Sequence, residues 1–209
     1  MKRVSSPALL ALTLVGALAA TPALAAPTVI DFDGPTSFAP IGDYYNGGAG
    51  PNLGVSFTEP ALGLANDALG TYFTNAPSMG GVMFTFDTGA FMNVAKGFTG
   101  EVSFFYSAAA AFADAVTIYS GLNGTGSVLG TFSLTDNATL GCSDSGFCHW
   151  DRLSLAFNGT AQSIGFGAGA GQLAFDDVSI SAVPEPESFA LMLAGLAAMG
   201  VVTRRQRRG

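Results

Sequence analysis

Short apolar runs alternate with clusters of glycine, asparagine, aspartate and proline through the middle of this 209-residue chain. The runs are rich in valine, phenylalanine, isoleucine and threonine, which is typical of β-strands bounded by turns. Alternation is clearest where Leu153, Leu155 and Phe157 share one face of an extended segment. We predict strands at Thr28–Phe32, Gly54–Thr58, Thr71–Thr74, Val82–Phe86, Glu101–Ser107, Ala115–Ser120, Val128–Leu134, Arg152–Phe157, Gln162–Gly167 and Leu173–Ser181.

Turn signals between these runs indicate how the strands are connected. Asn123-Gly124 and Asn158-Gly159 each lie between two apolar runs and predict two hairpins. The alanine run 108–111 is far shorter than the ~12 residues that an isolated helix needs, so we expect a loop or a single turn there. Strands and helices do not alternate, so the pattern predicts an all-β fold, an antiparallel β-sandwich of the jelly-roll type.

The first 25 residues have a different pattern from the rest of the chain. Lys2 and Arg3 precede an apolar run over 8–20, which ends in Ala23-Leu24-Ala25, a small-x-small cleavage pattern. The run lacks the polar residue at every third or fourth position that an amphipathic helix shows. We therefore predict a secretory signal peptide over residues 1–25, removed by signal peptidase.

The C-terminal region has an apolar stretch over 188–203 followed by Arg204-Arg205-Gln206-Arg207-Arg208. As a helix this stretch would reach about 24 Å, which spans a ~30 Å hydrocarbon core only marginally. The arginines would keep the C-terminus in the cytoplasm and leave the preceding domain on the far side of the membrane. We predict a transmembrane helix over 188–203, with 26–182 as the sandwich domain and 183–209 as a separate segment.

Val183-Pro184-Glu185-Pro186 stands directly before this stretch. A Pro-Glu-Pro motif, an apolar helix and a terminal arginine cluster in this order resemble the PEP-CTERM sorting family of bacterial exported proteins. The resemblance implies recognition by an exosortase, a membrane-embedded cysteine transpeptidase-like enzyme, and processing near the Pro-Glu-Pro motif. It also implies an association with bacteria that make exopolysaccharide. The residues expected to carry the sorting signal are Val183, Pro184, Glu185, Pro186, Arg204 and Arg205.

The net charge of the predicted domain differs from that of the whole chain. Among the fifteen acidic residues only Glu185 and Glu187 lie outside 26–182, and among the eight basic residues only Lys96 and Arg152 lie inside it. The domain therefore holds 13 acidic and 2 basic residues, a net charge of −11, against −7 for the whole chain. This balance excludes nucleic acid as a partner and favours cations or neutral glycans.

The strands at 101–106, 116–120, 128–132 and 175–180 look like those of secreted galactose-binding-like or carbohydrate-module jelly rolls. Such domains often carry a structural calcium ion, and calcium is the one candidate cofactor. Alternation within the last strand places Asp176 on the same face as Val178 and Ile180. It places Asp177 on the other face, with Leu173 and Phe175. One of the two carboxylates therefore faces inward unless the strand bulges. A buried carboxylate needs a proton, a hydrogen-bonding partner or a cation. The candidate calcium ligands are Asp31, Asp33, Asp176 and Asp177, with Asp43 and Asn46 as further oxygen donors.

Cys142 and Cys148 are the two cysteines of the chain, and His149 is its single histidine. Outside the cytoplasm an even number of cysteines indicates a disulfide, here one that closes a small loop. A zinc site with His149 is the alternative, although the chain has no second CxxC or HxxxH pair.

Catalytic patterns are scarce in this sequence. A Ser-His-Asp hydrolase would have to use His149, and no Gly-x-Ser-x-Gly elbow is present. The glycine-rich segment 165–170 lacks the following helix of a dinucleotide site, so we interpret it as a turn. Glu59, Glu101 and the many aspartates leave a glycan hydrolase as an alternative. The side chains that could stack on sugars are Tyr44, Tyr45, Tyr72, Tyr106, Tyr119 and Trp150.

Together these patterns predict an exported, non-catalytic surface or matrix protein, anchored in the membrane until exosortase processing releases it to the cell surface. A contribution to the exopolysaccharide matrix of a biofilm is one expectation. A carbohydrate-binding module with structural calcium, and a secreted glycan hydrolase, are the alternatives. Exosortase, signal peptidase and the membrane are the expected partners, with polysaccharide as a candidate ligand.

Overall fold

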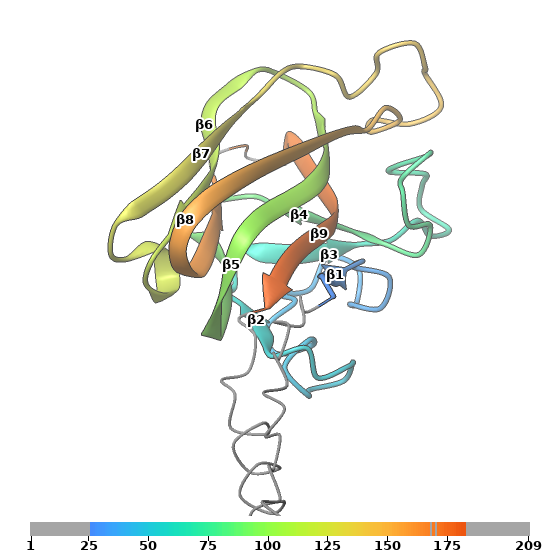
Figure 1. Ribbon diagram of the computed structural model, residues 1–209. Coiled ribbons are helices and arrows are strands. Elements are labelled where there is room, and N and C mark those ends of the chain that lie inside the picture. The colour runs from blue at the N-terminus through green and yellow to red at the C-terminus, as the bar shows by residue number, and fades with distance from the viewer. Residues whose placement is uncertain (1–25, 168, 170, 183–209) are drawn as a thin grey trace, which may run out of the picture.

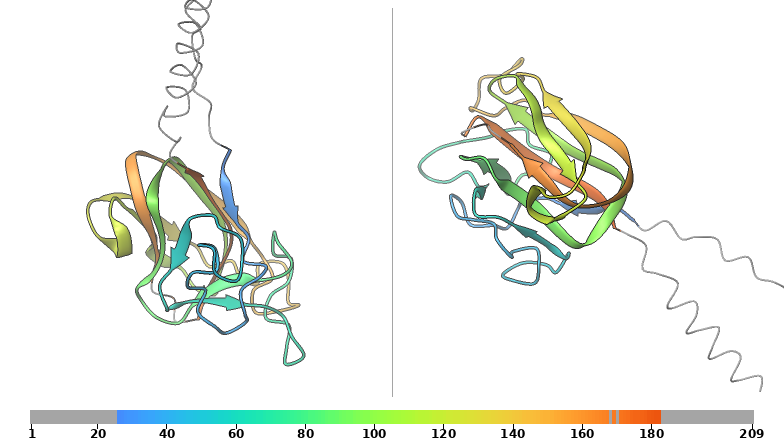
Figure 2. Two further views of the ribbon diagram at one scale, coloured as in Figure 1. Left: turned by 90° about the horizontal axis from the view of Figure 1, so that it is seen from below. Right: turned by 90° about the vertical axis from the view of Figure 1, so that its left-hand side faces the viewer.

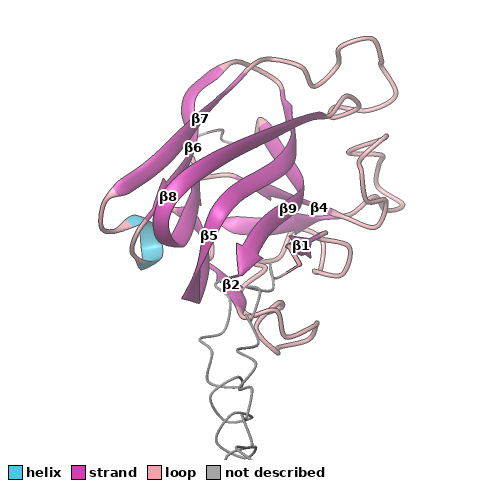
Figure 3. Ribbon diagram, viewed as in Figure 1, coloured by secondary structure: helices cyan, strands magenta, loops and turns pink. Residues whose placement is uncertain are grey.

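A computed structural model describes residues 26–167, 169 and 171–182, and in these residues the protein is an antiparallel β-structure (Figures 1 and 3). One short 3₁₀ turn, η1 (Leu122–Gly124), interrupts the β-structure. The strands are β1 (Thr28–Ile30), β2 (Val55–Phe57), β3 (Ala61–Leu64), β4 (Val82–Thr85), β5 (Ala90–Ala108), β6 (Phe112–Tyr119), β7 (Val128–Leu134), β8 (Asp151–Phe166) and β9 (Leu173–Ala182).

Two long strands, β5 and β8, connect the two layers of the molecule. Their hydrogen-bonding register shifts between Asn93 and Gly100 of β5, so each strand changes direction and continues into the other layer. The first layer contains β3, β4, β1, β9, the second half of β5 and the first half of β8. The second layer contains β2, the first half of β5, the second half of β8, β6 and β7 (Figure 2).

Aromatic side chains fill the space between the layers. Phe104 of the first layer meets Phe132 of the second, with ring centroids 4.8 Å apart, and Phe175 meets Phe166 at 4.9 Å. Edge-to-face contacts of this kind add to the free energy gained from burial itself. These contacts across the core confirm the predicted β-sandwich.

The predicted hairpin at Asn158-Gly159 is wrong. β8 runs without a turn from Asp151 to Phe166, and both of its halves pair with β5. Gly159 has a φ of 95°, which a glycine adopts readily, and the register shift opposite it lies between Phe98 and Gly100. A turn signal in the sequence therefore marks the bend of a continuous strand.

Other strand boundaries also need correction. Thr71–Thr74 is a loop in which Phe73 makes a single β-bridge to Phe147. Strand β3 and the first half of β5 were not predicted, because glycine and polar residues interrupt their apolar patterns. The hairpin at Asn123-Gly124 is confirmed, since β6 and β7 pair on either side of η1.

The alanine run after β5 forms no helix, as expected. The predicted signal peptide, the predicted transmembrane helix and the predicted sorting residues 183–186, 204 and 205 lie outside the described residues. Among the residues that are described, no helix is long and apolar enough to cross a membrane.

A second, smaller core lies on the outer face of the first layer. Leu64, Val82, Phe84 and Ala174 come from β3, β4 and β9, and Phe73 and Ala76 come from the loop before β4. Partly buried Phe147 and Trp150 pack on the same cluster from the loop before β8. We call this surface, with the loops 65–81 and 139–150 that lie on it, the covered face.

Candidate functional site

Three of the four predicted calcium ligands contact one serine of the covered face, Asp33 and Asp176 through their carboxylates and Asp31 through its main-chain oxygen. Ser78 Oγ lies 2.7 Å from the main-chain oxygen of Asp31, 2.7 Å from Asp33 Oδ1 and 3.0 Å from Asp176 Oδ1. Strands β1 and β9 are paired, with Thr28 opposite Ile180, and this pairing brings the two ends of the domain together. The first and last strands are therefore neighbours, as a shared site for Asp31, Asp33 and Asp176 requires.

The last strand bulges at Asp177, which has a φ of 46°. The bulge lets both Phe175 and Val178 face the main core, so Asp176 points to the covered face rather than sharing a face with Val178 as simple alternation predicted. Asp176 is fully buried and accepts hydrogen bonds from the main-chain N–H groups of Ser78 and Asp177, at 2.8 Å and 2.7 Å.

Burial raises the pKa of Asp176 to about 7, and the negative charge of Asp177 acts in the same direction. The hydrogen bonds from Ser78 and Asp177 lower this pKa but do not offset the loss of hydration. The pKa of Asp177 is also raised, first by burial and then by Asp31 and Asp33. The cluster therefore disfavours the ionised carboxylates, and Asp176 and Asp177 hold their protons to a higher pH than free aspartates do.

In the described part of the chain, no group of three or more histidine, cysteine, aspartate or glutamate side chains is arranged to hold a metal ion. Asp43 and Asn46 bond to each other, with Asn46 Nδ2 donating to Asp43 Oδ1 at 3.4 Å. Calcium at Asp31, Asp33, Asp176 and Asp177 stays a prediction. The residue that sequence reasoning missed is Ser78, which carried no signal because the carboxylates that it contacts lie 45 or more residues away.

The predicted disulfide is confirmed, because Cys142 and Cys148 are bonded to each other. Two hydrogen bonds join loop 139–150 to loop 65–81. Trp150 Nε1 donates to the main-chain oxygen of Thr74 at 2.9 Å, and Asn75 Nδ2 donates to the main-chain oxygen of Cys148 at 3.1 Å. His149 Nε2 lies 3.2 Å from Asp151 Oδ1. The two sulfurs are engaged with each other, so they do not form the alternative zinc site.

Most of the candidate sugar-stacking side chains serve packing. Tyr45 and Tyr106 are buried, and Tyr45 donates a hydrogen bond to Asp31 Oδ1 at 3.1 Å. Tyr44 packs on the main core, and Tyr72 and Trp150 pack on the second core. Tyr119 is different, because it lines a cleft on the opposite side of the molecule.

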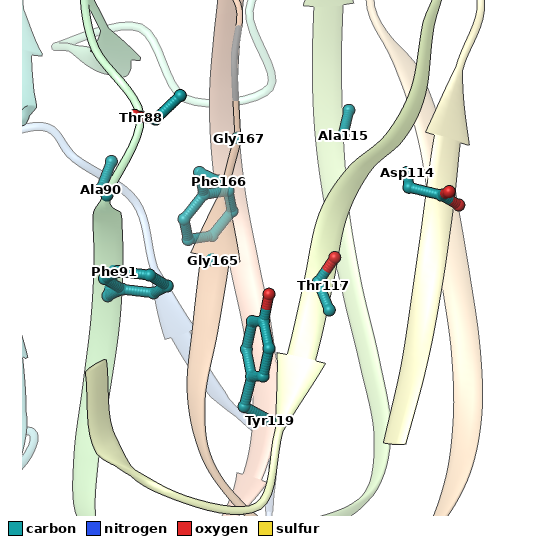
Figure 4. Close-up of a pocket in the computed structure, with 11 residues that line it drawn as sticks. Thr88, Ala90, Phe91, Asp114, Ala115, Thr117, Tyr119, Gly165, Phe166 and Gly167 are labelled. Atoms are coloured by element: carbon teal, nitrogen blue, oxygen red, sulfur yellow. The ribbon is translucent and has the colours of Figure 1, made fainter. Parts of the chain in front are cut away.

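We call the outer surface of the second layer, formed by β2, the first half of β5, the second half of β8 and β6, the open face. It carries a cleft of about 240 Å³ (Figure 4). Phe91 of β5 and Tyr119 of β6 stand in it with ring centroids 6.2 Å apart at 76°. The cleft lining is Thr88, Gly89, Ala90, Phe91, Asp114, Ala115, Thr117, Tyr119, Gly165, Phe166 and Gly167.

The floor of this cleft depends on glycine. Gly165 is opposite both Phe91 and Thr117 in the sheet. A Cβ at this position would lie 2.9 Å from the Phe91 ring and 3.3 Å from the Tyr119 ring. The glycine-rich segment that we interpreted as a turn therefore begins within β8, where Gly165 leaves room for the two rings.

Asp114 supplies a carboxylate to the cleft lining. It has a φ of 50° where β6 bulges against β7, between the pairs Phe112–Leu134 and Val116–Phe132. Positive φ is uncommon for residues other than glycine, and strand bulges often redirect a side chain beside a binding site. The cleft thus combines two aromatic rings, a hydroxyl at Thr117 and one carboxylate.

Residues 182–208 match the model of the PEP-CTERM protein-sorting motif. This match confirms the resemblance drawn from the Pro-Glu-Pro motif, the apolar stretch and the arginines. The motif indicates an exported protein that is sorted to the cell surface. No curated protein matches the chain significantly.

Several solved β-domains resemble the described fold. The K2 cleaved adhesin domain of Lys-gingipain is 13% identical, with a TM-score of 0.45, and the match covers 76% of this chain and 99% of that one. The C-terminal CBM6 of LamC, a marine laminarinase from Zobellia galactanivorans, is 14% identical, with a TM-score of 0.36 and coverage of 75% and 99%. A family 29 carbohydrate-binding module, CBM29-2, is 14% identical, with a TM-score of 0.34 and coverage of 75% and 92%.

Proposed function

We propose that this protein is a non-catalytic component of the cell surface or extracellular matrix, exported and then processed by an exosortase-type enzyme. The observation that carries the proposal is the sorting motif over 182–208. Strand β9 ends at Ala182, and Pro184 follows two residues later, so the motif begins where the sheet ends. An enzyme could therefore act on Pro184-Glu185-Pro186 without unpairing the last strand.

The test uses the full chain with an epitope in the exposed loop around Leu69, expressed in an exosortase-containing host and in its exosortase deletion. We expect a shortened, cell-surface or released form in the first host and the full-length, membrane-associated form in the second. Replacing Pro184 and Glu185 by alanine should reproduce the deletion, and Glu101→Gln on the sandwich serves as the control. Identical mass and location in both hosts would contradict the proposal.

Polysaccharide binding by the sandwich is a second candidate function, favoured by the open-face cleft. Aromatic rings suit the apolar faces of sugars, while Asp114 and Thr117 offer hydrogen-bonding groups for sugar hydroxyls. Such binding would attach the exported domain to an exopolysaccharide matrix. A hydrolase is less well supported, because glycoside hydrolysis usually needs two carboxylates, and among the described residues that line the cleft Asp114 alone carries one.

Affinity electrophoresis through gels cast with candidate polysaccharides tests this second function. The wild-type domain should be retarded by at least one polymer, and Phe91→Ala and Tyr119→Ala should migrate as in an empty gel. Tyr72→Ala, on the covered face, is the matched control and should keep the retardation. Equal migration of all four proteins in every gel would contradict polysaccharide binding.

Structural calcium at Asp31, Asp33, Asp176 and Asp177 is part of the same proposal. Oxygen ligands of this kind suit calcium, and the ion would offset the charge that gathers around Ser78. Calorimetry on chelator-treated domain tests it. We expect Tm to rise when calcium is returned, and Asp176→Asn should lose that rise; an unchanged Tm would contradict calcium binding.

A further inference from the structure

A second cleft adjoins the first on the open face. It measures about 350 Å³ and is lined by Asn46, Gly54, Ser56, Phe57, Thr58, Asn93, Ala95, Leu122 and Asn123. Thr58 of this cleft bonds to two residues that line the first cleft. Its Oγ1 accepts a hydrogen bond from Phe91 N at 2.8 Å and donates one to the Gly89 main-chain oxygen at 2.6 Å. Phe91 and Asn93 lie two residues apart on one face of β5, roughly 7 Å along the strand.

The loop around η1 stands beside Phe91 and completes the arrangement. Ser163 Oγ holds this loop by accepting from Gly124 N at 3.0 Å and donating to the Gly121 main-chain oxygen at 2.6 Å. A Cβ at Gly124 would lie 2.4 Å from the Phe91 ring, so loop and ring are in close contact. The two clefts are therefore neighbouring parts of one surface, with Phe91 between them.

The second cleft offers amides and hydroxyls. Asn93 Nδ2 donates to Asn123 Oδ1, and Asn123 N donates to Asn93 Oδ1, both at 2.8 Å. This reciprocal pair holds Asn123 at a φ of 53° and fixes the position of both side chains. A primary amide has two donors and two acceptor lone pairs, so Asn93 retains a donor and a lone pair for a ligand.

Charge narrows the choice of ligand. Among the described residues that line the two clefts, the single charged side chain is Asp114. The domain around them has a net charge of −11. An acidic polymer would meet repulsion from both, and fixed like charges at an interface strongly disfavour a wrong partner.

We infer that the open face binds one extended, uncharged polysaccharide chain across both clefts and rejects acidic chains. This inference rests on the polysaccharide binding proposed above and adds the length and the charge of the ligand. Sugar rings stack against Phe91 and Tyr119 in the first cleft. Hydroxyls of the following units bond to the amides around Asn93 in the second.

The experiment compares polymers that share a backbone and differ in charge: hydroxyethyl and carboxymethyl cellulose, dextran and carboxymethyl dextran, and methyl-esterified pectin and polygalacturonate. At low salt a neutral member should bind at least about tenfold more tightly than its acidic counterpart. Salt should reduce this difference, because it screens exposed charges. Asp114→Asn should reduce the difference as well, because it removes the one charged side chain among the described residues that line the two clefts.

The length of the ligand is tested by blocking the second cleft with Ser56→Tyr on β2. Ser56 points to the open face, between buried Val55 and Phe57, and strands tolerate an aromatic residue at such a position. This variant should bind the neutral polymer about tenfold more weakly, yet bind the disaccharide repeat of the same polymer as the wild type does. Tyr119→Ala should lose both ligands.

Three results would overturn the inference, and they are distinguishable. If no neutral polymer binds, the proposed polysaccharide binding itself fails. If neutral and acidic members bind equally, binding stands and the charge selection is wrong. If Ser56→Tyr binds the neutral polymer as tightly as the wild type while remaining folded by circular dichroism, the ligand does not cross into the second cleft.

Discussion

The two outer faces of this sandwich share the long strands β5 and β8 but have opposite properties. On the covered face, loops 65–81 and 139–150 bury Phe84 of β4 together with the loop residue Phe73, and the disulfide and Trp150 fix these loops in place. On the open face, Phe91 and Tyr119 stand over a glycine floor. The difference shows that aromatic residues on a sheet become packing when a loop covers them and become a candidate binding surface when none does.

Truncating the second core should have the largest effect. Phe73→Ala removes a ring that is 1% exposed, and we expect a loss of about 3–5 kcal/mol in the free energy of unfolding, measured by urea denaturation. Phe91→Ala on the open face is the matched control, with an expected loss of about 1 kcal/mol or less. Equal losses would show that the two faces do not differ in the way we describe.

Removing the disulfide should have the next largest effect. Replacing Cys142 and Cys148 by serine gives the unfolded chain more conformational freedom, because the short loop is no longer closed. We expect the free energy of unfolding to fall by roughly 2 kcal/mol. Polysaccharide binding should not change, because the loop lies on the covered face. A loss of binding in gels, with the domain still folded, would indicate that the two faces are coupled.

The Asp176 carboxyl should make the stability of the covered face depend on pH. Its pKa is 3.8 when unfolded and about 7 when folded, so the folded state holds an extra proton between these values. Stability should be full below pH 4, decline as the pH rises through 7 and level off above that. Thermal melts from pH 4 to 9 measure this, and Asp176→Asn should remove the decline. A wild-type Tm that rises over this range would contradict the assignment.

Filling the glycine floor should have the smallest effect on stability and a large one on binding. Gly165→Ala places a methyl group 2.9 Å from the Phe91 ring, which we expect to reduce the free energy of unfolding by about 1 kcal/mol. The ring would be displaced, so retardation in polysaccharide gels should be lost. Ser154→Ala, on the exposed part of β8, is the control, and unchanged binding by Gly165→Ala would mean that the cleft floor is not used.

Local chemistry in the sequence was enough to determine several features of this protein. Alternation at Leu153–Phe157, the Asn123-Gly124 turn, the cysteine pair and the Pro-Glu-Pro motif each depend on residues close together in the chain, and each predicted its feature correctly. The same local reasoning misplaced a hairpin at Asn158-Gly159, because a glycine permits a bend in a strand as readily as a turn.

Only the tertiary structure decided the rest. Asp176 faces Ser78 because the strand bulges at Asp177 and a loop 98 residues away in the sequence lies over it. The cleft forms because β5, β6 and β8 place Phe91, Tyr119 and Gly165 side by side. Both sites depend on register between distant strands and on which face a loop covers. The amino-acid pattern of a single strand determines neither the register nor the face that a loop covers.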